Sequence, residues 1–517
     1  MLRAQIAAAV TAAFLAPAAA AGPLTAGPPL EISMTNPLLG CAADGFGINF
    51  PNAEVEPFVG VNPTDARNIV AVYQQDRYDN GASKGTTAAV STNGGVSFTN
   101  VQVPTDTRCQ GGQFDRASDP WISFGPTGVA HAMSLVTDAA PGGPAGDNGM
   151  VYSRSTTGGL TWGNAIVLIK DSRTRYLNDK NSITADPNDA RFVYAVWDRA
   201  QNSQGSINNP DRVIGLGFKG PIYFARTTNG GLSWEPARKI YETGANKQTI
   251  GNQIVVRPQG ELFDIFADIV NSSNRRDGIG PVLVSYIVST NHGSTWTSPV
   301  RIDDQLPMTL FRADSTVDFE AAACPNPAKT GACPIRGGDL IPEVAVNRAN
   351  GKLYAVWMDA RFSFFDTGAF RWDSIAYSQS TDGGRTWSPA IQVNGTPPGS
   401  VQNSQAFTPS VHVAGDGTVT VTYYDFRNNT ASPASLDTTY FAVHCHPASE
   451  DCANPASWNE ETQIGSPFNI RTAPFARGYF LGDYMGLDSA GNDFTPVFGS
   501  TTGTGPSSQF FSRLAVP

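Results

Sequence analysis

The feature that most constrains the fold is a short pattern that occurs five times in the 517 residues. Each copy begins with Ser or Thr, has glycine at its fifth position and ends on Trp or Phe. The copies are Ser91–Phe98, Ser155–Trp162, Thr227–Trp234, Ser289–Trp296 and Ser380–Trp387. Glycine permits a positive φ, and Asn or Asp at the third position can cap the turn backbone. The pattern predicts five β-hairpin turns, each with an aromatic ring folded back over it.

A second recurring unit precedes each hairpin and reads as apolar strand, turn, apolar strand. The clearest examples are Ile183–Trp197 and Val344–Trp357, and others begin near Val59, Ile122, Ile254, Val411 and Met485. Two strands followed by a two-stranded hairpin form a four-stranded antiparallel blade. Because one blade cannot bury both of its faces, such blades stack around an axis. The sequence therefore predicts an all-β chain that folds as a β-propeller, and we count seven blades.

The five turns resemble the Asp-box, or BNR repeat, S-x-D-x-G-x-T-W, of the sialidase-like superfamily. Its third position is filled here by Asn93, Thr157, Asn229, Asn291 and Asp382, so only the fifth copy keeps the aspartate. In that superfamily the box is structural, which implies a structural role for these five residues. Sialidase domains with these boxes usually have six blades, so six is the alternative to our count of seven.

The last two units depart from the pattern. In the sixth, the strand Thr439–His444 leads into Cys445 and Cys452, and a disulfide there would replace the box with Trp458 as the aromatic cover. The seventh unit has Gln509–Val516 as its third strand and then the chain ends. We expect Glu31–Leu38 to supply its fourth strand, because this would cover both exposed edges.

The N-terminus reads as a signal peptide over residues 1–21. Arg3 is followed by the apolar run Ile6–Leu15 and an alanine-rich cleavage region, the arrangement of a secretory signal. No later apolar stretch is long enough to span a bilayer. We therefore expect a secreted or periplasmic protein, with a linker at residues 22–30 and a single propeller domain at residues 31–517.

Six cysteines follow the signal peptide, and an even number in an exported chain indicates disulfides. Fifteen pairings are possible for six cysteines. The simplest expectation is two local pairs, Cys324–Cys333 and Cys445–Cys452, with Cys41–Cys109 as the third.

The composition limits the partners. A net charge of −10 and a pI near 5.0 argue against nucleic acid, which requires a basic surface. We expect a monomer that binds an anionic carbohydrate and has no membrane span. No cofactor is expected, although Asp303–Asp304 or Asp186–Asp189 could hold a structural calcium ion. His444 and His446 share one strand face, where they could bind a metal or be inert, and no metal site is assigned.

Arginines recur where second strands end and where blades begin. In a propeller these positions share one face, and arginine binds carboxylates through two parallel hydrogen bonds. The candidate substrate-binding residues are Arg77, Arg116, Arg199, Arg361, Arg427 and Arg477. The alternative is that each recurring Asp–Arg pair is a structural pair within its own blade.

The segment around Leu353–Arg361 and the fifth box most resembles sialidase sequence. The resemblance implies that Asp366 or Asp373 is the acid/base residue, and that a tyrosine made reactive by a glutamate is the nucleophile. Tyr424 and Tyr484 are the candidate tyrosines, and Glu343 is the candidate glutamate. The Phe/Tyr-Arg-Ile-Pro motif of the family is absent from its expected place before the first box.

Three functions follow from these features. The first is a secreted sialidase-like exo-glycosidase that acts on carboxylate-bearing glycans. The second is a non-catalytic propeller that binds glycans or proteins. The third is a polysaccharide lyase that acts on uronates.

Overall fold

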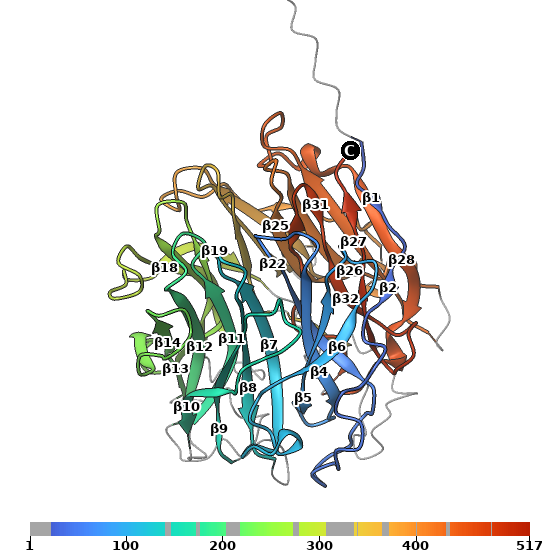
Figure 1. Cartoon of the computed structure of the whole chain (residues 1–517). Helices are drawn as coiled ribbons and strands as arrows, with labels where there is room; N and C mark the ends of the chain where they lie inside the picture. The colour runs from blue at the N-terminus through green and yellow to red at the C-terminus, as the bar shows by residue number, and fades with distance from the viewer. Residues whose placement is uncertain are drawn as a thin grey trace, which may run out of the picture.

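The computed structural model describes residues 22–139, 146–171, 176–202, 218–271, 279–306, 335–338, 340–363, 372–399, 401–430, 435–476 and 478–517. The predicted signal peptide, Asp366, Arg477 and the pair Cys324 and Cys333 lie outside these residues. Within them the chain is built of short antiparallel strands, which confirms the all-β prediction (Figure 1).

In the described part of the chain, six groups of four antiparallel strands follow one another. The first contains β3 (Glu54–Val61), β4 (Ile69–Arg77), β5 (Ser83–Ser91) and β6 (Thr99–Val103), and the second β7 (Arg116–Phe124), β8 (Ala130–Thr137), β9 (Asn148–Ser155) and β10 (Ile166–Asp171). The third contains β11 (Tyr176–Ala185), β12 (Val193–Asn202), β14 (Ile222–Thr227) and β15 (Arg238–Tyr241), and the fourth β16 (Lys247–Val256), β17 (Leu262–Asn271), β18 (Ile279–Ser289) and β19 (Val300–Gln305). The fifth contains β21 (Glu343–Val346), β22 (Leu353–Asp359), β23 (Ser374–Ser380) and β24 (Ile391–Gln392), and the sixth β25 (Ala406–Val413), β26 (Val419–Asp425), β27 (Asp437–Cys445) and β28 (Glu461–Asn469).

Short elements connect these groups. β13 (Phe218–Gly220) joins β12 to β16, and β20 (Ile335–Arg336) pairs in parallel with β29 (Tyr479–Phe480). The helical turns among the described residues are η1 (Arg108–Gln110), η4 (Ala360–Ser363), α1 (Val401–Ser404), η5 (Pro455–Trp458) and η6 (Ile470–Thr472). No helix among the described residues is both long and apolar enough to span a bilayer.

The two ends of the chain pair with each other. The C-terminal strands are β30 (Ser489–Ala490), β31 (Asp493–Phe494), β32 (Val497–Ser500), β33 (Ser508–Phe511) and β34 (Leu514–Ala515). β1 (Thr25–Ala26) pairs with β34 and β2 (Leu30–Glu31) pairs with β33, so blue and red segments lie side by side in Figure 1. The N-terminal pairing was expected from residues 31–38, and Glu31 and Ile32 do pair with β33, but the pairing begins earlier, at Thr25 and Leu30. Residues 22–30, expected to be a linker, contain β1, and Leu24 is buried in the core.

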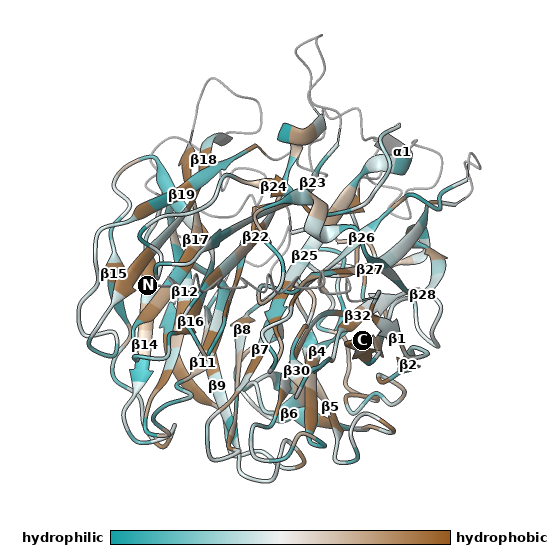
Figure 2. Cartoon of the chain, turned by 90° about the horizontal axis from the view of Figure 1, so that it is seen from above, coloured by the Kyte–Doolittle hydropathy of each residue, from teal (hydrophilic) through white to brown (hydrophobic). Residues whose placement is uncertain are grey.

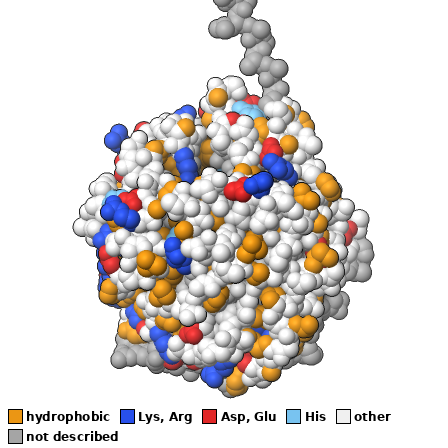
Figure 3. All heavy atoms as spheres, in the orientation of Figure 1, with side chains coloured by type: hydrophobic (Ala, Val, Ile, Leu, Met, Phe, Trp, Pro, Cys, Tyr) orange, Lys and Arg blue, Asp and Glu red, His pale blue; other side chains and the backbone are white. Residues whose placement is uncertain are grey.

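The core consists of apolar layers between consecutive groups. In one layer, Val196 and Phe224 of the third group pack with Leu262 and Phe266 of the fourth. Another layer joins Tyr73 of the first group to residues of the C-terminal strands, including Phe511. Hydrophobic residues accordingly concentrate on the strands in Figure 2, and the face in Figure 3 shows charged side chains only in scattered positions. Each group thus buries its faces against its neighbours.

The five predicted turns are present, and each joins the third and fourth strands of its group. In every copy the hydroxyl of the first residue accepts a hydrogen bond from the N–H of the fifth-position glycine, over 2.7 to 3.0 Å. The third residue accepts the N–H of the seventh, and Asn93, Thr157, Asn229, Asn291 and Asp382 all do so at 2.9 to 3.0 Å. Amide, hydroxyl and carboxylate oxygens therefore close the same turn.

The aromatic residue that ends each turn packs against the preceding group. Trp234 lies 4.8 Å from Tyr152, and Trp296 lies 5.6 Å from Phe224, measured between ring centroids. In the first turn, Phe98 instead contacts Phe511 of β33, at 5.2 Å. The rings predicted to cover their own turns therefore also join neighbouring groups.

The fifth-position glycine should be irreplaceable where it meets a ring. In Gly231→Ala the new Cβ would stand 1.9 Å from the hydroxyl of Tyr152, at a φ of +87°. We expect a loss of about 3 kcal/mol, combining left-handed strain with a steric clash. Gly244→Ala is the matched control, because its φ is +78° and nothing lies within 4 Å of its Cβ position. Urea unfolding of both variants measures the difference, and equal losses would contradict the packing explanation.

Two disulfides confirm the predicted pairs among the described cysteines. Cys41–Cys109 ties the N-terminal segment to η1, and Cys445–Cys452 spans the end of β27. Trp458 then packs 4.7 Å from Tyr377 of the fifth group. The disulfide-bonded segment thus occupies the place of a turn in the sixth group.

Candidate functional site

A β-bulge recurs in the first strand of several groups. The pairing register shifts there in β3, β7, β11, β16 and β25. One residue of each bulge has a positive φ, namely Glu56, Asp119, Lys180, Gly251 and Thr408. Bulges redirect side chains, and non-glycine residues in this conformation cost about 1–3 kcal/mol and concentrate at functional sites. The bulges therefore indicate that functional side chains lie on the first strands of these groups.

Three of these bulges bring ionisable side chains together around one ammonium group. Lys180 Nζ lies 3.2 Å from Glu56 Oε1, 2.9 Å from Asp119 Oδ2 and 2.6 Å from Asp483 Oδ2. Arg336 Nη2 lies 2.5 Å from the same oxygen of Asp483. Strands from the first, second and third groups thus meet a loop that lies 303 residues beyond Lys180.

Arg77 completes this set, which we call the Lys180 cluster: Glu56, Arg77, Asp119, Lys180, Arg336 and Asp483. Arg77 Nη1 donates to Gln74 Oε1 at 2.5 Å, and Gln74 in turn donates to Glu56. The guanidinium groups of Arg77 and Arg336 both lie over the ring of Phe480. The cluster contains three cationic and three acidic side chains.

The cluster is nearly but not fully buried. The exposed fractions of the Lys180, Asp483 and Arg336 side chains are 9%, 5% and 12%, and that of Glu56 is 1%. A buried charge requires compensation by a partner, and each carboxylate here has Lys180 as a neighbour. Solvent therefore reaches the edge of a charge network that is otherwise enclosed.

The carboxyl groups of the cluster have opposite pKa shifts. Burial raises the pKa of Glu56 to about 7, and the charge of Asp119 adds to the effect. Burial alone would also raise the pKa of Asp119, but Lys180 holds it below the usual value. Asp483 is likewise held below its usual pKa by Arg336 and Lys180, which outweigh its burial. Such a separation places a protonated and an ionised carboxyl side by side near neutral pH.

A cavity of about 20 Å³ adjoins the cluster, with Trp121, Lys180, Asn252, Glu343 and Tyr484 in its wall. Its volume matches about one water molecule. Neither amide atom of Asn252 has a hydrogen-bond partner among the described residues, although both are buried. Unsatisfied amide groups of this kind favour a polar occupant.

Two predicted catalytic residues, Glu343 and Tyr484, share this cavity. Burial raises the pKa of Glu343 to about 8, and Ser410 Oγ donates to its Oε1 at 3.3 Å. Burial also raises the pKa of Tyr484 well above its ordinary value. The Tyr484 hydroxyl donates to the Pro120 carbonyl at 2.9 Å. Tyr484 is thus held in the wall by backbone, and no glutamate contacts its hydroxyl among the described residues.

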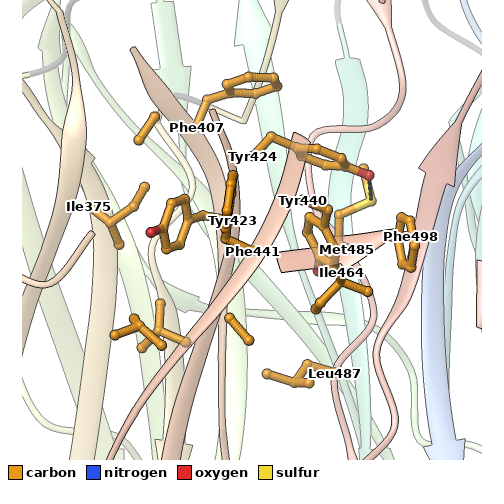
Figure 4. Close-up of a cluster of buried hydrophobic side chains, with 14 of the residues drawn as sticks. Ile375, Phe407, Tyr423, Tyr424, Tyr440, Phe441, Ile464, Met485, Leu487 and Phe498 are labelled. Carbon is orange, nitrogen blue, oxygen red and sulfur yellow. Dashed lines mark hydrogen bonds between the residues drawn. The ribbon is translucent and has the colours of Figure 1, made fainter. Parts of the chain in front are cut away.

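The other described catalytic candidates have different neighbours. Asp373 Oδ2 accepts a hydrogen bond from Gln405 at 3.0 Å. Tyr424 lies inside an apolar cluster of the sixth group, where its hydroxyl donates to the Gly499 carbonyl at 2.8 Å and contacts Met485 Sδ (Figure 4). Burial raises the pKa of Tyr424 well above its usual value. Its surroundings are those of a core residue.

Four predicted substrate-binding arginines each bind a carboxylate of the protein. Arg116 pairs with Asp44, Arg199 with Asp171, Arg361 with Asp303 and Asp359, and Arg427 with Asp425 and Glu461. Asp171 and Asp303 come from the last strand of the preceding group. Asp359, Asp425 and Glu461 belong to the arginine's own group. Of the described arginine candidates, only Arg77 belongs to the Lys180 cluster.

The carboxylates of the two segments proposed to hold calcium are bound to other side chains of the protein. Asp303 and Asp304 pair with Arg361 and Arg301. Asp186 accepts the hydroxyl of Tyr194 at 2.8 Å, and Asp189 pairs with Arg191. These carboxylates thus serve ion pairs and turns.

The sequence places Asp119, Lys180 and Asp483 at predicted blade entries, where they would add to a ring of charged side chains, but it gives none of them an individual role. It does not single out Glu56 or Arg336 at all. A signal was present, because Glu56, Asp119 and Thr408 each precede proline at the start of an apolar run. Proline at this recurring place marks a bulge in the first strand. Arg336 lies outside every repeat, and no such signal precedes it.

Glu343 should make the stability of the fold depend on pH. Its folded pKa of about 8 lies above its ordinary value of 4.5, so the stability it contributes is complete below pH 4.5 and is lost as pH rises toward 8. We expect Glu343→Gln to reduce the fall in unfolding free energy between pH 5 and 8 by roughly 2–4 kcal/mol. Urea unfolding at both pH values measures this, and an unchanged pH dependence would contradict the shift.

No family model matches the sequence, and no curated protein matches it either. Solved structures that are similar include an α-L-arabinofuranosidase from Fusarium graminearum, with a TM-score of 0.45, 11% identity, and 78% of this chain and 97% of that one covered. A leech intramolecular trans-sialidase has a TM-score of 0.42 and 13% identity, with 93% of this chain and 70% of that one covered. A protein of unknown function from Dyadobacter fermentans has a TM-score of 0.43 and 11% identity, with 91% of this chain and 97% of that one covered. All three TM-scores lie below 0.5, so these likenesses establish neither the family of this chain nor its activity.

Proposed function

We propose that the protein is a secreted β-propeller glycoside hydrolase that acts on a carboxylate-bearing glycan at the Lys180 cluster. The observation that carries this proposal is the pair of carboxyl groups with opposite pKa shifts, Glu56 and Asp119, on one ammonium group.

Seven Asp-box-type blades are the architecture that we propose. The six four-stranded groups and the C-terminal strands with β1 and β2 supply seven units. The contact of Phe98 with Phe511 supports a closed ring, because other turns contact the group before their own. Closure at this contact would leave no exposed sheet edge between the first and last units.

The proposed chemistry divides the work between two carboxyl groups. Protonated Glu56 gives its proton to the glycosidic oxygen as the bond to the anomeric carbon breaks. Ionised Asp119 stabilises the positive charge that develops on that carbon. Water then adds its hydroxyl group to the carbon and gives its proton to the Glu56 carboxylate, which restores the acid. Both carboxyl oxygens lie within 3.2 Å of Lys180 Nζ, so the groups are close neighbours, as in glycosidases that use a carboxylate pair.

The charge of the cluster favours an anionic sugar. When Glu56 is protonated, Arg77, Lys180 and Arg336 face only two ionised carboxylates, which leaves one positive charge in excess. A substrate carboxylate would neutralise it, as arginine and lysine do in other anion sites. Sialic and uronic acids are the sugar classes that carry this group.

Binding without hydrolysis is the second candidate function. It is favoured by the carboxylate partners of Arg116, Arg199, Arg361 and Arg427, which already occupy these predicted substrate-binding groups. In this case the Lys180 cluster would be a structural ion-pair network that holds the first strands together.

Purified protein incubated with a fluorogenic α-sialoside, a β-glucuronide and an uncharged β-galactoside tests the proposal. Faster release from an acidic sugar than from the galactoside is the expected result. An uronate polymer that gains the absorbance of an unsaturated sugar would instead identify a lyase. Glycan binding without product from any substrate would favour the second candidate. Recovery of the mature chain outside the cytoplasm, without residues 1–21, tests export.

A further inference from the structure

A second cavity lies beside the Cys445–Cys452 disulfide and shares no residue with the Lys180 cluster. Its volume is about 230 Å³, close to the lower end for small-molecule sites. The polar residues of its wall are His444, His446, Glu450, Ser457, Asn459 and Glu460. The proposed hydrolysis uses none of these side chains.

Three hydrogen-bonding atoms of this wall are buried and unpartnered among the described residues. They are His444 Nδ1, His446 Nε2 and Glu460 Oε2. His444 keeps only 3% of its exposure, and its ring lies perpendicular to that of His446 with centroids 4.9 Å apart. Buried polar atoms without partners are rare in native proteins and call for an occupant.

The hydrogen bonds made by the other ring nitrogen of each histidine decide whether the unpartnered nitrogen can accept a hydrogen bond. His444 hydrogen-bonds to the backbone of Glu460, and His446 Nδ1 lies 3.0 Å from Thr418 Oγ1. Burial lowers the pKa of His444 to about 4, so its imidazole is neutral at pH 7. A neutral imidazole with one bonded N–H presents a lone pair on its other nitrogen. In the His446 tautomer whose Nδ1–H donates to Thr418 Oγ1, Nε2 presents a lone pair as well. The cavity then presents acceptors beside two glutamates.

The wall is held in place before any ligand arrives. The disulfide closes the segment that carries both histidines and Glu450, and Glu450 accepts the backbone N–H of His446 at 2.8 Å. Trp458 Nε1 donates to the Cys452 carbonyl at 3.0 Å, which fixes η5 against the same segment. A preorganised wall reduces the entropic cost of binding.

We propose that this cavity binds a primary ammonium group, supplied by an amino sugar or by a lysine side chain. An ammonium group has three donors and no acceptor. This matches the three unpartnered atoms, of which one belongs to the Glu460 carboxylate, with the Glu450 carboxylate beside them. A metal ion fits less well, because no three His, Cys, Asp or Glu side chains in the described part of the chain lie close enough to share one.

Ligand-observed NMR titrations of the full mature protein test this proposal. The probes are glucosamine and Nα-acetyl-lysine methylamide, each paired with the form in which the amine is acetylated. We expect the free amines to bind and the acetylated forms to lose binding, and the tighter of the two amines identifies the source. Glu460→Gln should weaken binding about tenfold, since it removes a charged hydrogen-bond acceptor. His446→Gln should weaken it too, and Glu242→Gln, an exposed carboxylate elsewhere, should not.

Three results would overturn the proposal. These are no binding of either amine at millimolar concentration, binding that survives amine acetylation, and equal binding by wild type and by both cavity variants in their folded state. Micromolar binding of Zn²⁺ that is lost in His446→Gln, without amine binding, would replace the ammonium site with a metal site. Hydrolysis at the Lys180 cluster does not depend on any of these outcomes.

Discussion

Lys180→Met is expected to destabilise the fold by about 3–5 kcal/mol, because removing one partner leaves buried charges uncompensated. Methionine is unbranched like lysine and one atom shorter, and it leaves Glu56, Asp119 and Asp483 without their shared cation. Part of the loss should be recovered at low pH, where Glu56 is protonated. Urea unfolding at pH 5 and pH 8 measures both effects.

Lys170→Met provides the control for this change. Lys170 pairs with Asp147 at 2.9 Å, but both side chains keep about a third of their exposure. Pairs of this kind contribute only about 0–1 kcal/mol. If the two lysine variants lost the same stability, the Lys180 cluster would not be a buried charge network.

Glu56→Gln is expected to lower kcat by about 10²–10⁴-fold, because a general acid contributes that much to a hydrolytic rate. The amide keeps the shape of the side chain and its contact with Lys180, but it has no proton to give to a leaving group. Wild-type activity should fall as pH rises through about 7, where Glu56 loses its proton. This falling limb should be absent from the residual activity of the variant.

Glu54→Gln is the matched control for the activity prediction. Glu54 lies two residues earlier on β3, is equally buried, and has Gln75 and Ser33 as its partners instead of the Lys180 cluster. Its kcat should remain near that of the wild type. Equal losses in both variants, or an unchanged pH profile in Glu56→Gln, would exclude Glu56 as the acid and favour the structural network.

Much of the fold could be predicted from local patterns. Gly231 and Asn229 specify a turn through interactions that reach only four residues along the chain. Alternating apolar strands on either side of a turn then pair in the only register that buries both faces. The Cys445–Cys452 disulfide could also be predicted from the sequence, because its two cysteines are only seven residues apart.

The candidate site was only partly predictable. Glu343 and Tyr484 were selected and do line one cavity. The arginines were selected from a recurring Asp–Arg signature, and four of them bind protein carboxylates. A signature that repeats in each unit reflects what each unit needs in order to fold. A site such as the Lys180 cluster occurs once among the described residues, and its residues stand at positions where the repeated units differ from one another.

The sequence by itself therefore determined the all-β class, the five turns, their aromatic covers and two disulfides, because these depend on contacts within one unit or between adjacent strands. Only the tertiary structure decided that β1 and β2 join the C-terminal strands, and that Glu56, Asp119, Lys180 and Asp483 meet. Glu56 and Asp483 are separated by 427 residues, and no local pattern encodes their distance. Their pKa values arise from burial and mutual charge, which exist only once the strands have packed.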